Sequence, residues 1–174
     1  KQKIAAKQPY LSIADWRREN VNTLVRNVYS AIKRIDKNVV FGISPGGFMD
    51  ALKANDKYYV DFETWLGYDG YIDYLCPQLY WSNEHSTYPY NQILQRFLDA
   101  NVNPDVKMYV GVAAYKAGIK TEEAAWYKDA NVLRNMITYA RKTGEVDGFI
   151  LYRYNYLISK KNYTSLKNMM KEFK

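Results

Sequence analysis

The stretch Ile72-Asp73-Tyr74-Leu75-Cys76-Pro77-Gln78-Leu79-Tyr80-Trp81 decides the fold of this chain. Residues 72–79 make a strand-like apolar run that stops in a polar-aromatic cluster. Other runs end in the same way: 39–43 before Ser-Pro-Gly-Gly, 108–113 before Ala-Tyr-Lys, and 148–151 before Tyr-Arg-Tyr-Asn. Helical patterns separate these runs. Such an alternation predicts a parallel sheet, whose functional groups lie just past the carboxyl ends of the strands.

Helical spacing marks the segments between the strands. Ser12-Ile13-Ala14-Asp15 fits a capping box, and apolar residues then recur along one face as far as Ile35, so we expect a first helix. Further helices are predicted near residues 58–66, 90–100, 130–142 and 163–173, and Gly144 suits a helix stop.

The organisation is that of a single α/β domain over residues 1–174, because no linker composition divides the chain. A closed eight-stranded barrel typically needs about 250 residues. The strand-like runs therefore make either a small open sheet or half of a barrel.

Composition narrows the function classes. The net charge is +7, but the lysines are scattered, so we interpret them as a solvated basic surface and expect no nucleic-acid partner. A single cysteine, Cys76, excludes an intrachain disulfide and a cysteine-based zinc site, and we expect its side chain to be buried. Because His85 is the only histidine, we expect neither a histidine-dependent triad nor a multi-histidine metal site.

Several motifs are missing from the sequence. No glycine-rich nucleotide-binding pattern occurs, so we expect no cofactor, and Ser44 lacks the Gly-x-Ser-x-Gly elbow of an esterase. No apolar run is long enough to cross a bilayer, and no signal-peptide pattern opens the sequence. Because the chain begins at Lys1 without a methionine, we expect a mature form or an excised piece.

Family resemblance rests on three strings: Asp15-Trp16-Arg17-Arg18 within residues 14–22, Ser-Pro-Gly-Gly within 41–47, and Pro-Gln-Leu-Tyr-Trp within 72–81. Together they resemble the C-terminal half of the glycosyl hydrolase-like family ten barrels, and residues 109–116 and 146–154 resemble the next two strands. The resemblance implies strands five to eight of a (β/α)8 TIM-type barrel, with the N-terminal half before Lys1. It also implies a glycoside hydrolase that acts on a poly- or oligosaccharide. Since many members are bacterial envelope lipoproteins, it implies a cell-envelope or extracellular location.

Carboxylates are scarce at the predicted strand ends. Glycoside hydrolysis normally needs two carboxyl groups about 5–5.5 Å or about 6.5–9.5 Å apart, depending on the stereochemistry. Asp50 and Glu84 are loop acids that either serve the site or are simply solvated. Asp73 and Asp147 precede strands, so we interpret them as turn or cap residues at the stability end. The catalytic acids are therefore expected on the absent half, and this segment alone is expected to be inactive.

Candidate substrate-binding residues follow the strands. Gln78 offers an amide, and Tyr80 and Trp81 offer rings that stack on sugars, although alternate strand residues face opposite sides and one of them can point into the wall. Tyr115, Lys116 and Arg153 are further candidates that packing or surface ion pairs would explain equally well. For Arg17 on the first helix, we expect a structural ion pair.

Three hypotheses follow. The first is the carbohydrate-binding half of a glycoside hydrolase, the second is a non-catalytic carbohydrate-binding or scaffold domain, and the third is a basic nucleic-acid-binding protein. Because the outer strands of a half barrel expose unpaired edges, we also expect a partner: the N-terminal half of the same barrel, or a second copy of the chain.

Overall fold

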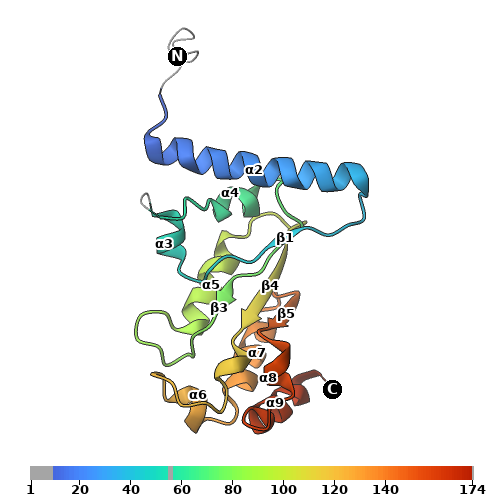
Figure 1. Ribbon diagram of the computed structural model, residues 1–174. Helices are drawn as coiled ribbons and strands as arrows, with labels where there is room; N and C mark the ends of the chain where they lie inside the picture. Colours follow the sequence, from blue (N-terminus) through green and yellow to red (C-terminus); the bar gives the residue numbers. More distant parts are fainter. Residues whose placement is uncertain (1–9, 55–56, 174) are drawn as a thin grey trace.

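The computed structural model describes residues 10–54 and 57–173 (Figure 1). A long helix, α2 (Ile13–Ile35), precedes an alternation of strands and helices. The Ser12 hydroxyl accepts a hydrogen bond from the backbone N–H of Asp15, which confirms the predicted N-cap of α2. The other helices are α3 (Met49–Lys53), α4 (Phe62–Gly67), α5 (Tyr90–Ala100), α6 (Ala125–Lys128), α7 (Val132–Thr143), α8 (Tyr154–Leu157) and α9 (Tyr163–Met169), with the 3-10 turns η1 (Ala114–Lys116) and η2 (Met170–Phe173).

The sheet is parallel throughout. Its strands are β1 (Gly42–Ile43), β2 (Tyr74–Leu75), β3 (Gln78–Leu79), β4 (Lys107–Val112) and β5 (Gly148–Leu151). β1 pairs with β2, β2 and β3 pair in turn with β4, and β5 pairs with the opposite edge of β4. β2 and β3 are the two ends of the predicted strand 72–79, and Pro77 between them has no N–H for a ladder. The resulting α/β architecture, with strands in chain order and flanking helices, is compatible with a partial TIM-type barrel, as predicted.

One face of the sheet and its helices form the core. Leu75, Met108 and Val110 are fully buried on this face together with the inner residues of α5 and α7. The predicted inward residues of those helices are all buried: Ile93, Leu94, Phe97 and Leu98 on α5, and Leu133, Met136, Ile137 and Ala140 on α7. Gly144 ends α7 with a φ of 75°, the left-handed conformation that glycine adopts at low cost, so the predicted stop is confirmed.

The opposite face of the sheet is more open. Paired residues of neighbouring strands point to the same side, so Tyr74, Tyr109 and Ile150 share this face. Ile150 is 46% exposed. The Tyr74 ring lies where a Cβ at Gly42 would be, and the Tyr109 ring lies where a Cβ at Gly148 would be. Glycine on the outer strands thus lets the rings of the inner strands lie across them.

The amino end of the sheet is held by carboxylates. Asp73 accepts hydrogen bonds from the backbone N–H of Phe41 at 2.7 Å and from Lys33 Nζ at 2.7 Å. Asp147 accepts from the backbone N–H of Met108 at 2.8 Å. Each side chain therefore ties the start of its own strand to the start of the preceding strand, which confirms the predicted structural role of both aspartates.

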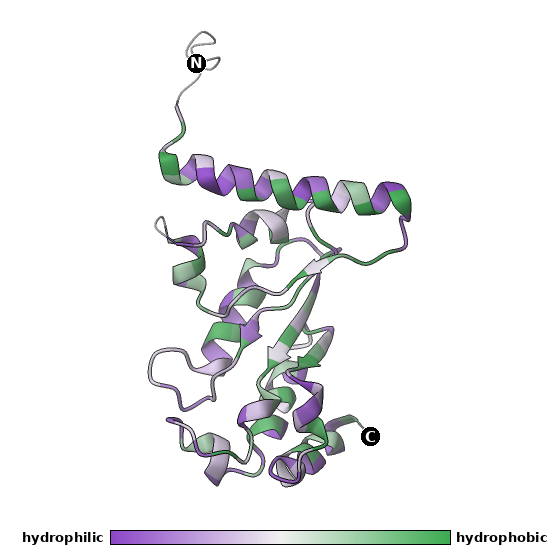
Figure 2. Cartoon of the chain, in the orientation of Figure 1, coloured by the Kyte–Doolittle hydropathy of each residue, from purple (hydrophilic) through white to green (hydrophobic). Residues whose placement is uncertain are grey.

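One sequence expectation about the amino-terminal part is wrong. An apolar run without alternation, such as 39–43, predicts a strand that is covered on both faces. The structure reduces this strand to β1, and Val39 and Val40 are 46% and 64% exposed. The apolar residues of α2 do not all face inward: Leu24 is 62% exposed and Ile35 is 88% exposed. Figure 2 shows hydrophobic residues recurring along the whole of α2. The inner face of the helix is anchored by Val25, which is buried in the core, and by a polar contact in which the Trp65 indole N–H donates to the Asn22 side chain at 2.8 Å.

Some helix boundaries also differ from the predicted ones. The predicted helix 58–66 is replaced by α4, and the closing segment 163–173 is divided between α9 and η2. In the described part of the chain, no helix is both long and apolar enough to cross a membrane.

Candidate functional site

A group of tyrosine rings, which we name the tyrosine cluster, follows the last three strands of the sheet. Tyr80 and Tyr152 lie nearly parallel, with centroids 5.9 Å apart and an interplanar angle of 25°. Tyr115 stands edge-on to both at 6.0 and 6.1 Å, and Tyr156 lies 6.0 Å from Tyr115. Burial, followed by the neighbouring Cys76 thiol and the phenol groups of Tyr115 and Tyr152, raises the pKa of Tyr80 to about 12. Its hydroxyl is therefore neutral at physiological pH and can both donate and accept hydrogen bonds.

Arg153 extends the tyrosine cluster. Its guanidinium carbon lies 5.9 Å from the ring centroid of Tyr152 and 5.8 Å from that of Tyr156, within cation–π range. The side chain belongs to an exposed residue directly after β5, and the peptide bond between Tyr152 and Arg153 is cis. Tyr80, Tyr115 and Arg153, three of the predicted binding residues, thus belong to one cluster, and their role in binding stays a prediction.

A second group of rings, the tryptophan cluster, consists of Phe48, Trp81, His85 and Tyr88. Phe48 meets Trp81 edge-on at 4.6 Å, while Tyr88 and His85 lie 5.0 and 5.9 Å from Trp81. Trp81 is only 8% exposed. A Cβ at Gly47 would lie 2.6 Å from the indole, so the second glycine of the Ser-Pro-Gly-Gly string makes room for this ring.

A partly buried ion pair connects the loops that follow β3 and β4. Lys116 Nζ donates to the carbonyl oxygen of Tyr80 at 2.6 Å and lies 3.4 Å from Glu123 Oε1. Glu123 Oε2 accepts from the backbone N–H of Ser82 at 2.6 Å. The side chains of Lys116 and Glu123 are 20% and 11% exposed. Glu123 therefore ties the two loops together from one side chain.

The environment of Glu123 keeps it ionised. Burial alone would raise its pKa, but the hydrogen bond from the Ser82 N–H and the ammonium of Lys116 outweigh burial, and the pKa lies below its ordinary value. A carboxyl group with a lowered pKa is a poor proton donor at neutral pH. Its geometry suits a positioning role.

A hollow of about 380 Å³ opens between these two loops. It brings the tryptophan cluster and the ion pair together in one place, since both contribute to its walls. The lining residues are Trp81, Glu84, His85, Ser86, Lys116, Glu122, Glu123 and Ala124. An indole wall with several hydrogen-bonding groups is chemically suited to a polar ligand that has an apolar face.

The predicted binding residues thus divide between two neighbouring places. Tyr80, Tyr115 and Arg153 belong to the tyrosine cluster, whereas Trp81 and Lys116 line the hollow. The rings of Tyr80 and Trp81 join different clusters, and of the two only Trp81 lines the hollow. Gln78 stands apart and donates from Nε2 to the carbonyl oxygen of Ser44 at 3.1 Å, so it fastens the loop after β1.

Sequence reasoning did not identify Glu123, Tyr152 or Tyr156 as site residues. Tyr152 and Tyr156 lie in the aromatic segment around Arg153, so the density of tyrosine after β5 was an available signal. Glu123 lies far along the loop after β4, beyond the positions directly past the strand, and no local pattern marks it.

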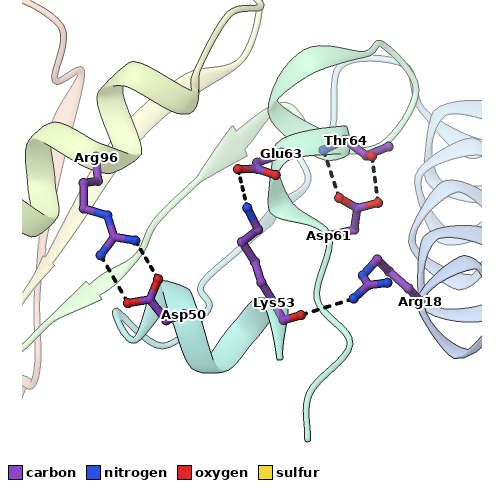
Figure 3. A network of polar contacts seen from close by, with 7 residues as sticks. All are labelled: Arg18, Asp50, Lys53, Asp61, Glu63, Thr64 and Arg96. Carbon is purple, nitrogen blue, oxygen red and sulfur yellow. Dashed lines mark hydrogen bonds and ion pairs between the residues drawn. The ribbon is translucent and has the colours of Figure 1, made fainter. Parts of the chain in front are cut away.

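The remaining candidates lie elsewhere. Asp50 on α3 is paired with Arg96 of α5 at 2.7 Å (Figure 3), and the Arg96 hydrogen bond keeps its pKa below the ordinary value. The same figure shows α3 linked to α4 through Lys53 and Glu63, so this part of the chain is a structural network. Arg17 donates to the Tyr59 hydroxyl; in the described residues its partner is a tyrosine rather than the expected carboxylate.

Cys76 is 1% exposed, as predicted, and burial raises the pKa of its thiol to about 11. Among residues 10–54 and 57–173, no group of three or more histidine, cysteine, aspartate or glutamate side chains could hold a metal ion.

The fold and these strand ends define an α/β protein of the partial TIM-barrel type. Comparison with known proteins identifies the family. Residues 1–129 match the family described as glycosyl hydrolase-like 10. The chain is 32% identical over 163 residues to glycosyl hydrolase DigH of Escherichia coli strain K12, a match that covers 85% of this chain and 37% of that protein. It is 36% identical over 123 residues to glycosyl hydrolase YngK of Bacillus subtilis strain 168, covering 63% and 24%.

The chain therefore belongs to the glycosyl hydrolase-like 10 family, and the predicted resemblance is confirmed. It spans well under half the length of these relatives.

Proposed function

We propose that this chain is the carbohydrate-binding half of a glycoside hydrolase barrel and acts on the glycosidic bonds of a poly- or oligosaccharide. The observation that carries the proposal is the meeting of the tyrosine cluster, the tryptophan cluster and the Lys116–Glu123 pair at the carboxyl ends of parallel strands. In barrels of this type the substrate binds at that end. Aromatic rings stack on the apolar faces of sugars, and the polar groups beside them bind hydroxyls.

The catalytic acids are proposed to come from another part of the barrel. Two carboxyl groups must flank one bond, and one of them must carry a proton. Glu123 is held ionised by Ser82 and Lys116, and Asp50 is occupied by Arg96. The described strand ends therefore supply binding groups more readily than an acid pair.

The missing part is proposed to cover α2 and the free edge of β1. Within the described residues, β1 pairs only with β2, so its other edge is unpaired. The exposed side chains of Ile13, Leu24 and Ile35 form a second apolar face on α2, separate from the face that carries Asn22. The length of the relatives fits this proposal, because a preceding barrel half would be the natural occupant.

Carbohydrate binding provides the direct test of the site. Isothermal titration of the full chain with a panel of neutral oligosaccharides should give saturable binding to at least one of them. Trp81→Ala should abolish that binding, whereas Tyr68→Ala, at a position 68% exposed beyond α4, should leave it unchanged. Absence of both binding and hydrolysis across the panel would contradict the proposal.

Self-association tests the proposed cover of α2. Light scattering should show that the 174-residue chain associates, and Leu24→Asp should weaken the association. A stable, well-folded monomer would count against an incomplete barrel.

A non-catalytic carbohydrate-binding domain is the second candidate function. It is favoured by the absence of an identified acid pair among the described strand-end residues. One measurement distinguishes the two candidates. A longer polypeptide that contains this sequence should release reducing sugars from an oligosaccharide if it is a hydrolase. It should bind the oligosaccharide without cleaving it if it is a binding domain.

A further inference from the structure

The imidazole of His85 is held in one orientation by its own loop. The backbone N–H groups of Thr87 and Tyr88 both donate to Nδ1, at 3.2 and 2.9 Å. The ring also contacts Trp81 and Tyr88 in the tryptophan cluster, with centroids 5.9 and 5.5 Å away. Two hydrogen bonds and two ring contacts therefore fix a single side chain that lines the hollow.

These hydrogen bonds determine the tautomer of neutral His85. A nitrogen that accepts two N–H groups cannot also carry a proton, so the proton of the neutral ring is on Nε2. In the described part of the chain, no oxygen accepts a hydrogen bond from this Nε2–H. The loop between β3 and α5 thus prepares one free donor in the wall of the hollow.

The loop that carries His85 is itself well ordered by hydrogen bonds. Ser82, which is 1% exposed, accepts through its hydroxyl from the backbone N–H of Glu84 and through its carbonyl from that of Tyr90. Its own N–H is bound by Glu123. The position of His85 is therefore set by the same ion pair that joins the two loops.

We propose that His85 is a specificity-determining residue that binds carbohydrate in the hollow through its Nε2–H. This inference rests on the proposed function and names the ligand class more closely. The donor binds a hydroxyl oxygen of a pyranose whose apolar face lies against Trp81.

The other lining groups indicate that the bound sugar is neutral. Lys116 has three N–H donors, of which Tyr80 and Glu123 occupy two, so one remains for a hydroxyl. Glu84 and Glu122 provide acceptors in the same hollow. Glutamates outnumber lysine in this lining, so a uronic acid would meet repulsion that a neutral hexose would not.

Paired substitutions separate the binding role of His85 from its structural role. In His85→Asn, the amide oxygen can replace Nδ1 as acceptor for the Thr87 and Tyr88 N–H groups, but the Nε2 donor is lost. In His85→Ala, both functions are lost. We expect His85→Asn to retain the thermal stability of the wild type and His85→Ala to be less stable. The affinity of both variants for a neutral tetrasaccharide that binds the wild type should fall about tenfold, which is the effect of one lost hydrogen bond.

The measurement uses the full chain with cellotetraose, chitotetraose, mannotetraose and tetragalacturonate, by isothermal titration. Nitrogen-15 NMR of the histidine ring should show Nε2 protonated, with its signal shifting on saturation with the neutral sugar that binds. Full affinity in His85→Asn, or tighter binding of tetragalacturonate than of every neutral sugar, would overturn the inference and leave the proposed function standing. If no tetrasaccharide binds the wild type, both fail.

Discussion

Both ends of the sheet have hydrogen bonds from backbone N–H groups to carboxylates, but these bonds stabilise different parts of the molecule. At the amino end, the carboxylates of Asp73 and Asp147 accept backbone N–H groups from neighbouring strands. At the carboxyl end, Glu123 accepts the backbone N–H of Ser82 from a neighbouring loop. The first pair fixes strand register, whereas Glu123 fixes the walls of a hollow. Stability and binding are therefore expected to separate along the strand direction, as they do in closed barrels.

The largest effect is expected for Asp73→Ala. This substitution removes the acceptor for Phe41 and the ion-pair partner of Lys33, whose side chain is 22% exposed. Because hydrogen bonds to charged groups contribute about 1.5–3 kcal/mol, the free energy of unfolding should fall by about 2 kcal/mol. Urea denaturation measures this change. Sugar affinity of the folded protein should be unaltered, and a large loss of affinity would break the comparison between the two ends.

Lowering the pH should remove the stabilising hydrogen bonds of the carboxylates at both ends of the sheet. Desolvation raises the pKa of Asp73, but the hydrogen bonds from Lys33 and Phe41 outweigh it, and the net pKa is lowered, as it is for Glu123. As the pH falls, these two carboxylates bind protons in the unfolded chain before they do so in the folded chain. Their contribution to stability is therefore present above the ordinary pKa values of 3.8 and 4.5 and is lost as the pH falls below them. Thermal denaturation from pH 6 to pH 3 should show a falling midpoint. Asp73→Asn should flatten this profile, and an unchanged slope would show that other groups dominate.

Substitution of Glu123 should affect binding more than stability. Glu123→Ala leaves the Ser82 N–H without its acceptor and Lys116 with one partner fewer, so we expect a loss of about 1 kcal/mol in unfolding free energy. Sugar affinity should fall because the two loops are no longer joined. Glu123→Gln keeps an acceptor for Ser82 and serves as the matched control. Equal affinity in the alanine variant and the wild type would show that the hollow is ordered without the ion pair.

The smallest effect is expected for Asp147→Asn. The amide oxygen can still accept from Met108, and the lost ion pair with Lys107 is 3.4 Å long and largely exposed. Surface pairs of this kind contribute about 0–1 kcal/mol, so the free energy of unfolding should change by less than about 0.5 kcal/mol. Urea denaturation of Asp147→Asn and Asp73→Asn under the same conditions compares their free energies of unfolding. A change as large as that of Asp73→Asn would mean that burial does not distinguish the two aspartates.

Local sequence signals predicted the elements that depend on near neighbours. The helix expected at residues 90–100 is α5, and the strand expected at 148–151 is β5. Periodicity succeeds for such elements because one face packs on the sheet and the other meets solvent. It also predicted α2, but Leu24 and Ile35 of that helix are exposed, since apolar spacing does not indicate whether a partner surface is present within the same segment.

Most candidate site residues were predicted because they follow a strand closely in the sequence. Tyr80, Trp81 and Tyr115 were found in this way, and the structure shows that they join two different ring clusters. Tyr80 and Trp81 lie past the end of β3, so the direction of each ring is set by the loop and its tertiary contacts. Those contacts could be read only from the structure.

The sequence by itself determined the alternation of strands and helices, the family, and the aromatic and polar character of the strand ends, because each is written in residues close together along the chain. Only the tertiary structure decided that Glu123 reaches Ser82 and that His85, with Nδ1 bound by its own loop, lines a shared hollow. Those contacts depend on how separate loops meet above a common sheet. Loop geometry and strand register determine which loop residues come into contact, and neither has a local pattern in the sequence.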